Sequence, residues 1–183
     1  MPGIVVRVLD SRLGDRLFNR EPSDLIVTPT MPMRDIVNAI LGKLGGRSLG
    51  RLDILAHGYY TQHDARLRMS NVGGQGVMLG KENLGFDTVG AFAALKPRFD
   101  IDGRIDMFAC QIADHVSADG PAKSGEALMR ELARVAGVVV RASDSAHNFQ
   151  RNAYLGTIDR GTWEGAVYLF YPDGRKVEEL VSR

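Results

Sequence analysis

Short apolar runs that alternate with segments of helical period constrain the fold of this chain more than any other feature. Four of these runs have the length and character of buried strands: residues 4–9, 52–56, 105–109 and 138–142. Between them, apolar side chains recur at helical spacing in residues 33–44, 89–96 and 125–136. Strands that alternate with helices predict βαβ units, and therefore an α/β fold with a mainly parallel central sheet.

The remaining segments are expected to complete this sheet. Residues 25–28 and 153–155 predict short strands. Residues 166–170, together with the turn Pro172-Asp173-Gly174, predict a C-terminal β-hairpin. Residues 59–86 contain several glycines and predict an irregular hairpin over the end of the sheet.

Length, charge and apolar runs describe an ordinary globular domain. With 183 residues and no linker, residues 1–183 are expected to form a single domain. Lysine and arginine number 23 against 22 aspartates and glutamates, and this balance predicts no nucleic-acid partner. The longest apolar runs, such as residues 135–140, fall far short of the ~18 residues of a membrane span, so no membrane partner is expected. The N-terminus lacks a signal-peptide pattern, which favours a cytoplasmic protein and leaves leaderless export open.

The chain has a single cysteine, Cys110, which excludes an internal disulfide and a zinc site built from several thiolates. One thiol can still act as a nucleophile. Cys110 directly follows the strand expected at residues 105–109, and His57 directly follows the strand expected at residues 52–56. Adjacent parallel strands would place both side chains at the carboxyl edge of the sheet, where ligands of α/β proteins gather.

A thiol and an imidazole at one sheet edge suit nucleophilic catalysis. A free thiol is only a few per cent thiolate at neutral pH, and a histidine can hold its proton and return it to a leaving amine. The N–H groups of Gly58 and Cys110 are candidate donors to an oxyanion. Taken alone, a cysteine after an apolar run is more often a small buried hydrophobe, and a His-Gly pair is more often a turn. The same pattern at both residues favours the catalytic interpretation.

Three segments follow one another in an order that is known from a group of peptidases. Two are Leu52-Asp53-Ile54-Leu55-Ala56-His57-Gly58 and Ile105-Asp106-Met107-Phe108-Ala109-Cys110. The third runs from Gly125-Glu126-Ala127-Leu128 through Ala136-Gly137-Val138-Val139-Val140 to Ala142-Ser143-Asp144. Together they resemble the caspase-like cysteine peptidases, a clan that includes caspases, gingipains, legumain and separase, and most closely bacterial caspase-like domains of uncharacterised type. The resemblance covers roughly residues 50–165.

The resemblance implies a caspase-like three-layer αβα sandwich and a cysteine endopeptidase with a dyad of His57 and Cys110. It also implies that Asp144, beyond the strand after the cysteine, selects a basic residue before the cut, with Asp114 as a weaker rival. The alternative for Asp144 is a turn cap. Caspases carry Gln and Arg-Gly around Ala-Cys, whereas here Phe108 precedes that pair and Gln111 follows it, so aspartate specificity is not expected.

Other candidate sites are weaker. His63, His115 and His147 form no pair at ligand spacing, and we expect loop histidines, no metal and no cofactor. The segment 120–125 lacks the order of a phosphate loop. The expected partner is a protein or peptide substrate, and the oligomeric state stays open. Two alternative functions remain: a catalytically silent caspase-like module for binding or assembly, and a non-peptidase hydrolase or acyltransferase that uses the same pair.

Overall fold

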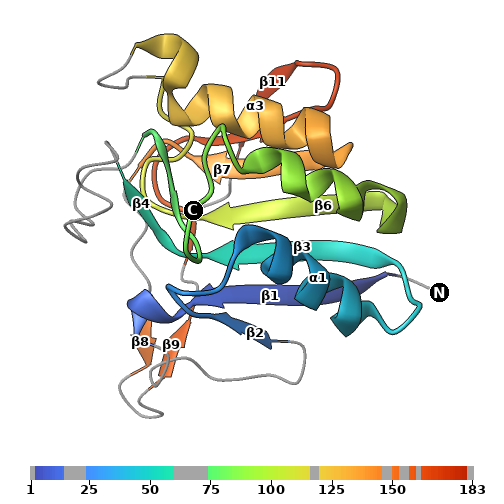
Figure 1. Ribbon diagram of the computed structural model, residues 1–183. Coiled ribbons are helices and arrows are strands. Elements are labelled where there is room, and N and C mark those ends of the chain that lie inside the picture. The colour runs from blue at the N-terminus through green and yellow to red at the C-terminus, as the bar shows by residue number, and fades with distance from the viewer. Residues whose placement is uncertain are drawn as a thin grey trace.

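The structure is a computed structural model that describes residues 3–14, 24–59, 74–115, 120–145, 150–152, 157–159 and 162–180. Within these residues, seven strands form one sheet in the order β11-β10-β7-β6-β3-β1-β2 (Figure 1). Its strands are β1 (Ile4–Asp10), β2 (Asp24–Val27), β3 (Leu49–Leu55), β6 (Phe99–Phe108), β7 (Val139–Ser143), β10 (Val167–Phe170) and β11 (Lys176–Glu179). The neighbouring strands β2, β1, β3, β6 and β7 run parallel to one another. Strand β10 pairs antiparallel with both of its neighbours, β7 and β11. The α/β fold, the mainly parallel sheet and the C-terminal hairpin are confirmed.

Three helices cover one face of this sheet in the described part of the chain. They are α1 (Met33–Leu44), the 3-10 helix η3 (Val89–Arg98) and α3 (Gly125–Ala136). Figure 1 shows all three in front of the strands, with η3 in green between α1 and α3. Their buried side chains form one apolar core with the strand residues that face them, including Val8, Ile54 and Met107. This face supplies most of the hydrophobic stabilisation of the domain.

The opposite face of the sheet carries a row of charged side chains. Arg7, Asp53, Asp106 and Arg141 are direct neighbours across β1, β3, β6 and β7. Both aspartates are buried, and Arg51 Nε lies 2.8 Å from Asp53 Oδ1 and 4.0 Å from Asp106 Oδ2. The arginines therefore cover a central pair of like charges on this face.

The charged face explains a difference from the expected three layers. No helix covers this face among the described residues, and the second helical layer is not found there. A helix that packs on a sheet needs a continuous apolar surface. Here that surface is limited to a small cluster of Leu9, Leu55 and Phe108, and Trp163 stacks on Phe108 with ring centroids 4.5 Å apart.

Local sequence explains how the helices begin and end. Ser124 caps α3 by accepting a hydrogen bond from the N–H of Ala127, and Gly137 ends the helix in the left-handed conformation. The helix expected at residues 89–96 is a 3-10 helix. At its start, the N–H of Ala91 donates a hydrogen bond to the carbonyl of Thr88, three residues earlier. It continues through Pro97, so its predicted end before the proline is wrong.

Smaller elements lie beyond the ends of the main sheet. Strands β4 (His57–Tyr59) and β5 (Gly76–Met78) pair antiparallel. This hairpin starts two residues before the irregular hairpin expected at 59–86, and residues 60–73 lie outside the described residues. A second pair consists of β8 (Gln150–Asn152) and β9 (Thr157–Asp159). The strand expected at 153–155 also lies outside the described residues.

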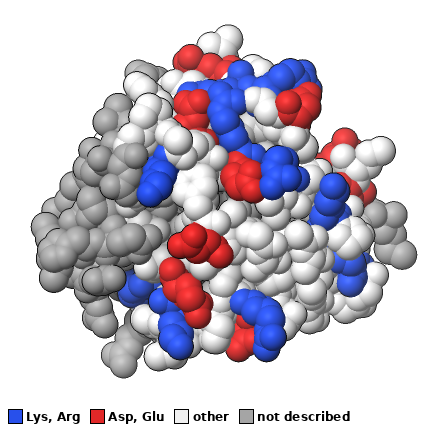
Figure 2. Space-filling view, turned by 45° about the horizontal axis from the view of Figure 1, so that its top comes forward, with Lys and Arg blue, Asp and Glu red and all other residues white. Residues whose placement is uncertain are grey.

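The described surface shows no grouping of one charge sign on the face seen in Figure 2, where acidic and basic side chains are interspersed. Several of them form pairs along α3, such as Glu126 with Arg130 and Glu131 with Arg134. In the described part of the chain, no helix has the length and apolar character that a membrane crossing requires.

Candidate functional site

The carboxyl ends of β3 and β6 bring the two predicted catalytic residues to one edge of the sheet. These strands are neighbours, and Leu55 is paired with Phe108 at their last shared position. The contact continues one residue further, since the N–H of Ala56 donates to the carbonyl of Phe108 over 3.1 Å. His57 follows directly, and Cys110 stands two residues after Phe108. The predicted placement of both residues at this edge is confirmed.

Gly58 lies against the backbone of Cys110. A Cβ at Gly58 would overlap the carbonyl oxygen of Cys110 and would lie 3.2 Å from its carbonyl carbon and 3.3 Å from its nitrogen. Glycine is needed here because the two backbones approach more closely than any side chain permits. The space that a side chain would take at Gly58 is occupied by the carbonyl oxygen of Cys110. The N–H groups of both residues therefore lie within one small region.

The turn that carries Cys110 is held in a strained conformation. Gln111, the next residue, has a φ of 51°, which is uncommon for a residue other than glycine. Its N–H donates to the carbonyl of Ser145 over 2.9 Å, and the N–H of Ala113 donates to the carbonyl of Ser143 over 3.0 Å. Strained backbone of this kind is concentrated at functional sites, where the surrounding structure maintains it.

The same turn is fixed from the other side by α3. The N–H of Glu126 donates to the carbonyl of Asp114 over 2.9 Å. A Cβ at Gly125 would overlap the carbonyl oxygen of Ile112, so the start of α3 lies directly against the turn. Cys110, which is partly buried, is thus held between β7, α3 and Gly58.

His57 is partly buried and lies toward β1 as well as β6. Its imidazole forms a hydrogen bond with the backbone of Arg12, and because this bond favours the protonated ring, the imidazole donates to the Arg12 carbonyl. Burial lowers the pKa of His57 below its ordinary value of 6.5, while the bond to Arg12 and the charge of Asp10 raise it. A histidine that stays neutral near pH 7 can accept the proton of a thiol.

The lowered pKa predicts that His57 affects stability in acid. The unfolded chain binds a proton at His57 at higher pH than the folded chain does. Protonation therefore lowers the free energy of unfolding. This loss of stability is absent above about pH 6.5 and grows as the pH falls below that value. We expect wild type to lose more stability than His57→Gln between about pH 7 and pH 5, as measured by urea unfolding. Equal losses in the two proteins would contradict the direction of this shift.

Asp10 and Arg12 were not among the predicted site residues. Asp10 is the last residue of β1 and is buried, and Arg12 stands in the single 3-10 turn η1 (Ser11–Leu13) that follows. One feature of the sequence could have indicated Asp10: it directly follows the apolar run 4–9, just as His57 and Cys110 follow theirs. The contribution of Arg12 comes from its backbone carbonyl, for which a sequence has no signature.

Asp144 lies at the end of β7, beside a pocket of about 300 Å³. This pocket lies between Asp114, Asp144, Ser145, Tyr168 and Lys176, so it holds both acidic residues that the sequence suggested. Asp144 Oδ1 accepts hydrogen bonds from the Ser145 hydroxyl and from the N–H of Ala166, each over 3.1 Å. Burial, and then the charge of Asp144, raises the pKa of Tyr168 above its ordinary value. The bonds from Ser145 and Ala166 also partly agree with the alternative that Asp144 caps a turn.

Lys176 brings a positive charge to the same pocket. Its ammonium lies 3.8 Å from the centroid of the Tyr168 ring and 2.6 Å from Glu126 Oε2. The pocket thus brings two carboxylates, Asp114 and Asp144, together with one ammonium group among the described residues.

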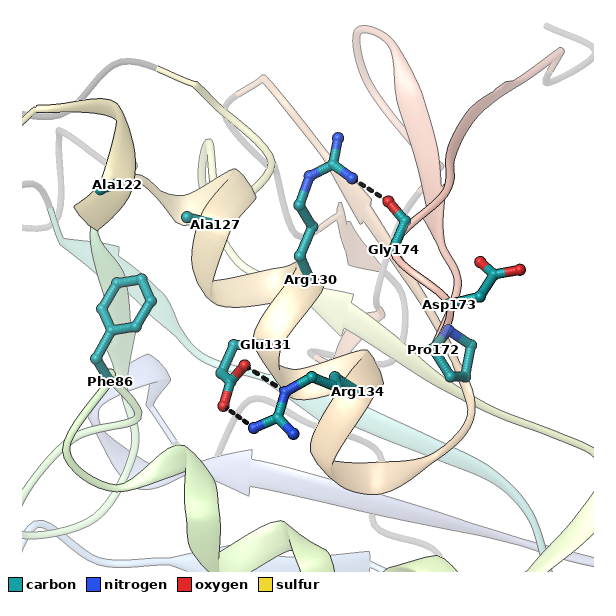
Figure 3. Close-up of a pocket in the computed structure, with 9 residues that line it drawn as sticks. All are labelled: Phe86, Ala122, Ala127, Arg130, Glu131, Arg134, Pro172, Asp173 and Gly174. Carbon is teal, nitrogen blue, oxygen red and sulfur yellow. Dashed lines mark hydrogen bonds and ion pairs between the residues drawn. The ribbon is translucent and has the colours of Figure 1, made fainter.

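Two further pockets lie apart from these residues. One, of about 490 Å³, lies between α3, Phe86 and the turn of the C-terminal hairpin, and Figure 3 shows Arg130 reaching the carbonyl of Gly174 across it. None of His57, Cys110 and Asp144 lines it. The other, of about 430 Å³, is lined by Tyr59 of β4, Gln75, Lys123 and residues 85–87.

Of the three remaining histidines, His115 is the one within the described residues. His115 is exposed beside Asp114, with Nδ1 3.6 Å from Asp114 Oδ1, and His63 and His147 lie outside the described residues. Among the residues that the structure describes, no group of histidine, cysteine and acidic side chains could hold a metal ion.

Comparison of the chain with protein-family models, curated proteins and solved structures finds no match.

Proposed function

We propose that this protein is a caspase-like cysteine endopeptidase in which His57 and Cys110 form the catalytic dyad. One observation carries the proposal: the backbone of Gly58 lies directly against that of Cys110, so the histidine and the cysteine occupy one edge of a parallel sheet. The strained turn at Gln111 and the bond between His57 and Arg12 add support, because both fix the reacting groups in position.

The dyad would act by nucleophilic catalysis. His57 takes the thiol proton of Cys110 as Sγ attacks the scissile carbonyl carbon. The resulting oxyanion is bound by the N–H groups of Gly58 and Cys110, and losing one such donor typically costs ~10²–10³ in rate. The C–N bond then breaks as His57 returns the proton to the leaving amine, which leaves a thioester. Water gives a proton to His57 and attacks the thioester, the C–S bond breaks, and the thiol regains its proton.

The pocket beside Asp144 would bind a basic side chain before the cut. Its two aspartates face the single ammonium of Lys176, whose charge is already paired with Glu126. A guanidinium or ammonium group in this pocket would lie beside two carboxylates, which favour a cation. Ser145, next to Asp144, accepts the N–H of Gln111, so the pocket borders the turn that carries Cys110.

The fold supports the same proposal at a coarser level. Five neighbouring strands run parallel, and β1 lies between β2 and β3. The chain passes from β1 toward one edge of the sheet and from β3 toward the other edge, so the strand order reverses between β1 and β3. In sheets of this order the ligand lies beyond the carboxyl ends at that point. His57 and Arg12 stand there. The caspase-like form of this α/β fold remains part of the proposal.

An electrophilic peptide tests the proposal. A peptidyl acyloxymethyl ketone with arginine next to the ketone is offered to wild type, and N-acetylcysteine serves as the reference thiol. We expect wild type to react far faster than the reference, His57→Ala to react at least ~10²-fold more slowly than wild type, and Cys110→Ala not to react. Wild-type labelling no faster than N-acetylcysteine would contradict the peptidase and favour the binding module.

The same reagent separates the pocket from the dyad. With arginine in the probe, Asp144→Asn is expected to lower the labelling rate about tenfold, because one charge-assisted hydrogen bond is lost. With leucine in place of arginine, wild type and Asp144→Asn should react equally. Equal rates with the arginine probe as well would contradict the pocket assignment and leave the dyad intact.

A further inference from the structure

The pocket of about 430 Å³ that Tyr59 lines, which we name the Tyr59 pocket, lies beside the proposed dyad. Tyr59 directly follows Gly58, and the backbone of Gly58 lies against that of Cys110. Tyr59 belongs to β4, which begins two residues after the end of β3, and β3 is the neighbour of β6 in the sheet. One wall of the pocket is therefore a direct continuation of the segment that carries His57.

Another wall of this pocket reaches the turn of the proposed nucleophile through α3. Gln75 lines the pocket, and the carbonyl of the preceding Gly74 accepts the N–H of Gly125. A Cβ at Gly125 would overlap the carbonyl oxygen of Ile112, which belongs to that turn. Two separate backbone contacts thus connect the pocket to the turn.

The pocket beside Asp144 reaches the same turn from the other side. Its lining includes Ser145, just beyond β7, whose carbonyl accepts the N–H of Gln111. In the sheet, β6 lies between β7 and β3, so Cys110 at the end of β6 stands between the two pockets. Successive side chains of an extended chain point in opposite directions. When the side chain before the scissile bond enters the pocket beside Asp144, the next side chain therefore points toward the Tyr59 pocket.

A rigid aromatic ring forms the floor of the Tyr59 pocket. Tyr59 is almost fully buried. A Cβ at Gly76 would overlap the ring, and a Cβ at Gly85 would lie 3.1 Å from the hydroxyl oxygen, so two glycine backbones enclose the side chain. The enclosed ring keeps one position when a ligand enters, and it offers the ligand a preformed apolar surface.

Phe86 is the part of the lining that a ligand can cover. It is 40% exposed, and covering an aromatic surface with another apolar group is favourable. Asp87 and Lys123, which carry opposite charges, also line the pocket, so charge favours neither an acidic nor a basic ligand. The lining therefore suits a large apolar side chain.

We propose that the Tyr59 pocket binds the side chain of the residue after the scissile bond and selects a large apolar one, such as leucine or phenylalanine. Phe86 is the specificity-determining residue of this subsite. The inference rests on the proposed function and deepens it. The substrate class becomes a protein in which a basic residue is followed directly by a large apolar residue.

Two peptides test the proposal. Both have arginine before the cut, and the residue after the cut is leucine in one peptide and serine in the other. We expect wild type to cleave the leucine peptide with a kcat/KM about tenfold higher, because leucine fills the pocket and serine does not. Phe86→Ala should lower this preference to about threefold or less and leave cleavage of the serine peptide unchanged.

Ile101→Ala is the matched control for Phe86→Ala. Ile101 is 96% exposed near the start of β6, whereas Cys110 follows the other end of this strand, and Ile101 does not line the Tyr59 pocket. The control also removes an exposed apolar side chain, and it should keep the wild-type preference. A wild type that cleaves both peptides equally well, or a Phe86→Ala variant with the wild-type preference, would overturn the inference and leave the dyad intact.

Binding to Cys110→Ala separates this inference from the peptidase. The same peptides carry a fluorescent label at the N-terminus, and anisotropy gives the Kd of each for Cys110→Ala with and without Phe86→Ala. We expect the leucine peptide to bind about tenfold more tightly than the serine peptide, and Phe86→Ala to remove most of this difference. If wild type cleaves neither peptide and Cys110→Ala shows this difference, only the peptidase is contradicted. Equal binding of the two peptides would overturn the pocket assignment, whether or not wild type cleaves them.

Discussion

Replacing Gly58 with alanine is expected to lower the reactivity of Cys110 toward the arginine probe by ~10²-fold. The new methyl group would overlap the carbonyl oxygen of Cys110 and press on its carbonyl carbon and nitrogen. All three are backbone atoms, so no side chain can rotate away, and the ends of β3 and β6 must move apart by about 1 Å. A displacement of that size between reacting groups costs ~10²-fold in rate, and the overpacking costs a further ~1–3 kcal/mol of stability.

Gly42→Ala is the matched control for this substitution. Gly42 is exposed within α1, and a Cβ there would meet nothing within 4 Å. Alanine should stabilise that helix by about 0.5–1 kcal/mol and leave the labelling rate unchanged. Labelling rates and urea midpoints are measured for both variants. A Gly58→Ala protein that reacts like wild type would show that the close approach of the two backbones has no part in the site.

The placement of His57 and Cys110 at one edge of the sheet could be predicted because each directly follows a short apolar run. Parallel strands end at one edge of a sheet, so two such runs need only be neighbours for their following residues to meet. The backbone contact between Gly58 and Cys110 bears out that reasoning. The sequence could not show how the Cys110 turn is held, since the bonds from Gln111 and Ala113 to the end of β7 join backbone atoms.

The role of β1 could not be predicted for a related reason. Asp10 follows an apolar run as His57 does, but the run does not say which strand lies beside β3. That order depends on how the connections cross the sheet, which is a property of tertiary packing. Arg12 raises the pKa of His57 through its backbone carbonyl, a group that every residue possesses.

The charged face of the sheet is visible in the sequence. In β3 and β6 the same alternation recurs, with Arg51 two residues before Asp53 and Arg104 two residues before Asp106. Charged residues at a period of two indicate a strand with one polar face, whereas the apolar residues between them indicated burial on both faces. The alternation therefore argued against a helix packed on that face.

Replacing Arg51 with methionine is expected to destabilise the domain by about 3 kcal/mol. Asp53 and Asp106 face one another across β3 and β6, and both side chains are buried. Arg51 Nε lies between them, 2.8 Å from Asp53 Oδ1 and 4.0 Å from Asp106 Oδ2. Removing one partner from a buried ion pair typically costs ~3–5 kcal/mol, although Arg104 still pairs with Asp106, from Nε to Oδ1 over 3.0 Å. The lower end applies because Arg51 itself is partly exposed.

The control for Arg51 is Arg134→Met, which breaks an exposed pair with Glu131 on α3 and should cost less than ~1 kcal/mol. Urea unfolding measures both, and the double variant Arg51→Met with Asp53→Asn should recover much of the loss, because it removes one of the two facing charges. A single Arg51→Met variant within ~1 kcal/mol of wild type would show that the other contacts of Asp53 suffice.

The outcome also bears on the site, because β3 and β6 are the strands whose ends carry His57 and Cys110. If Arg51 holds these two strands together, the variant should also label more slowly in proportion to the fraction of protein that is unfolded.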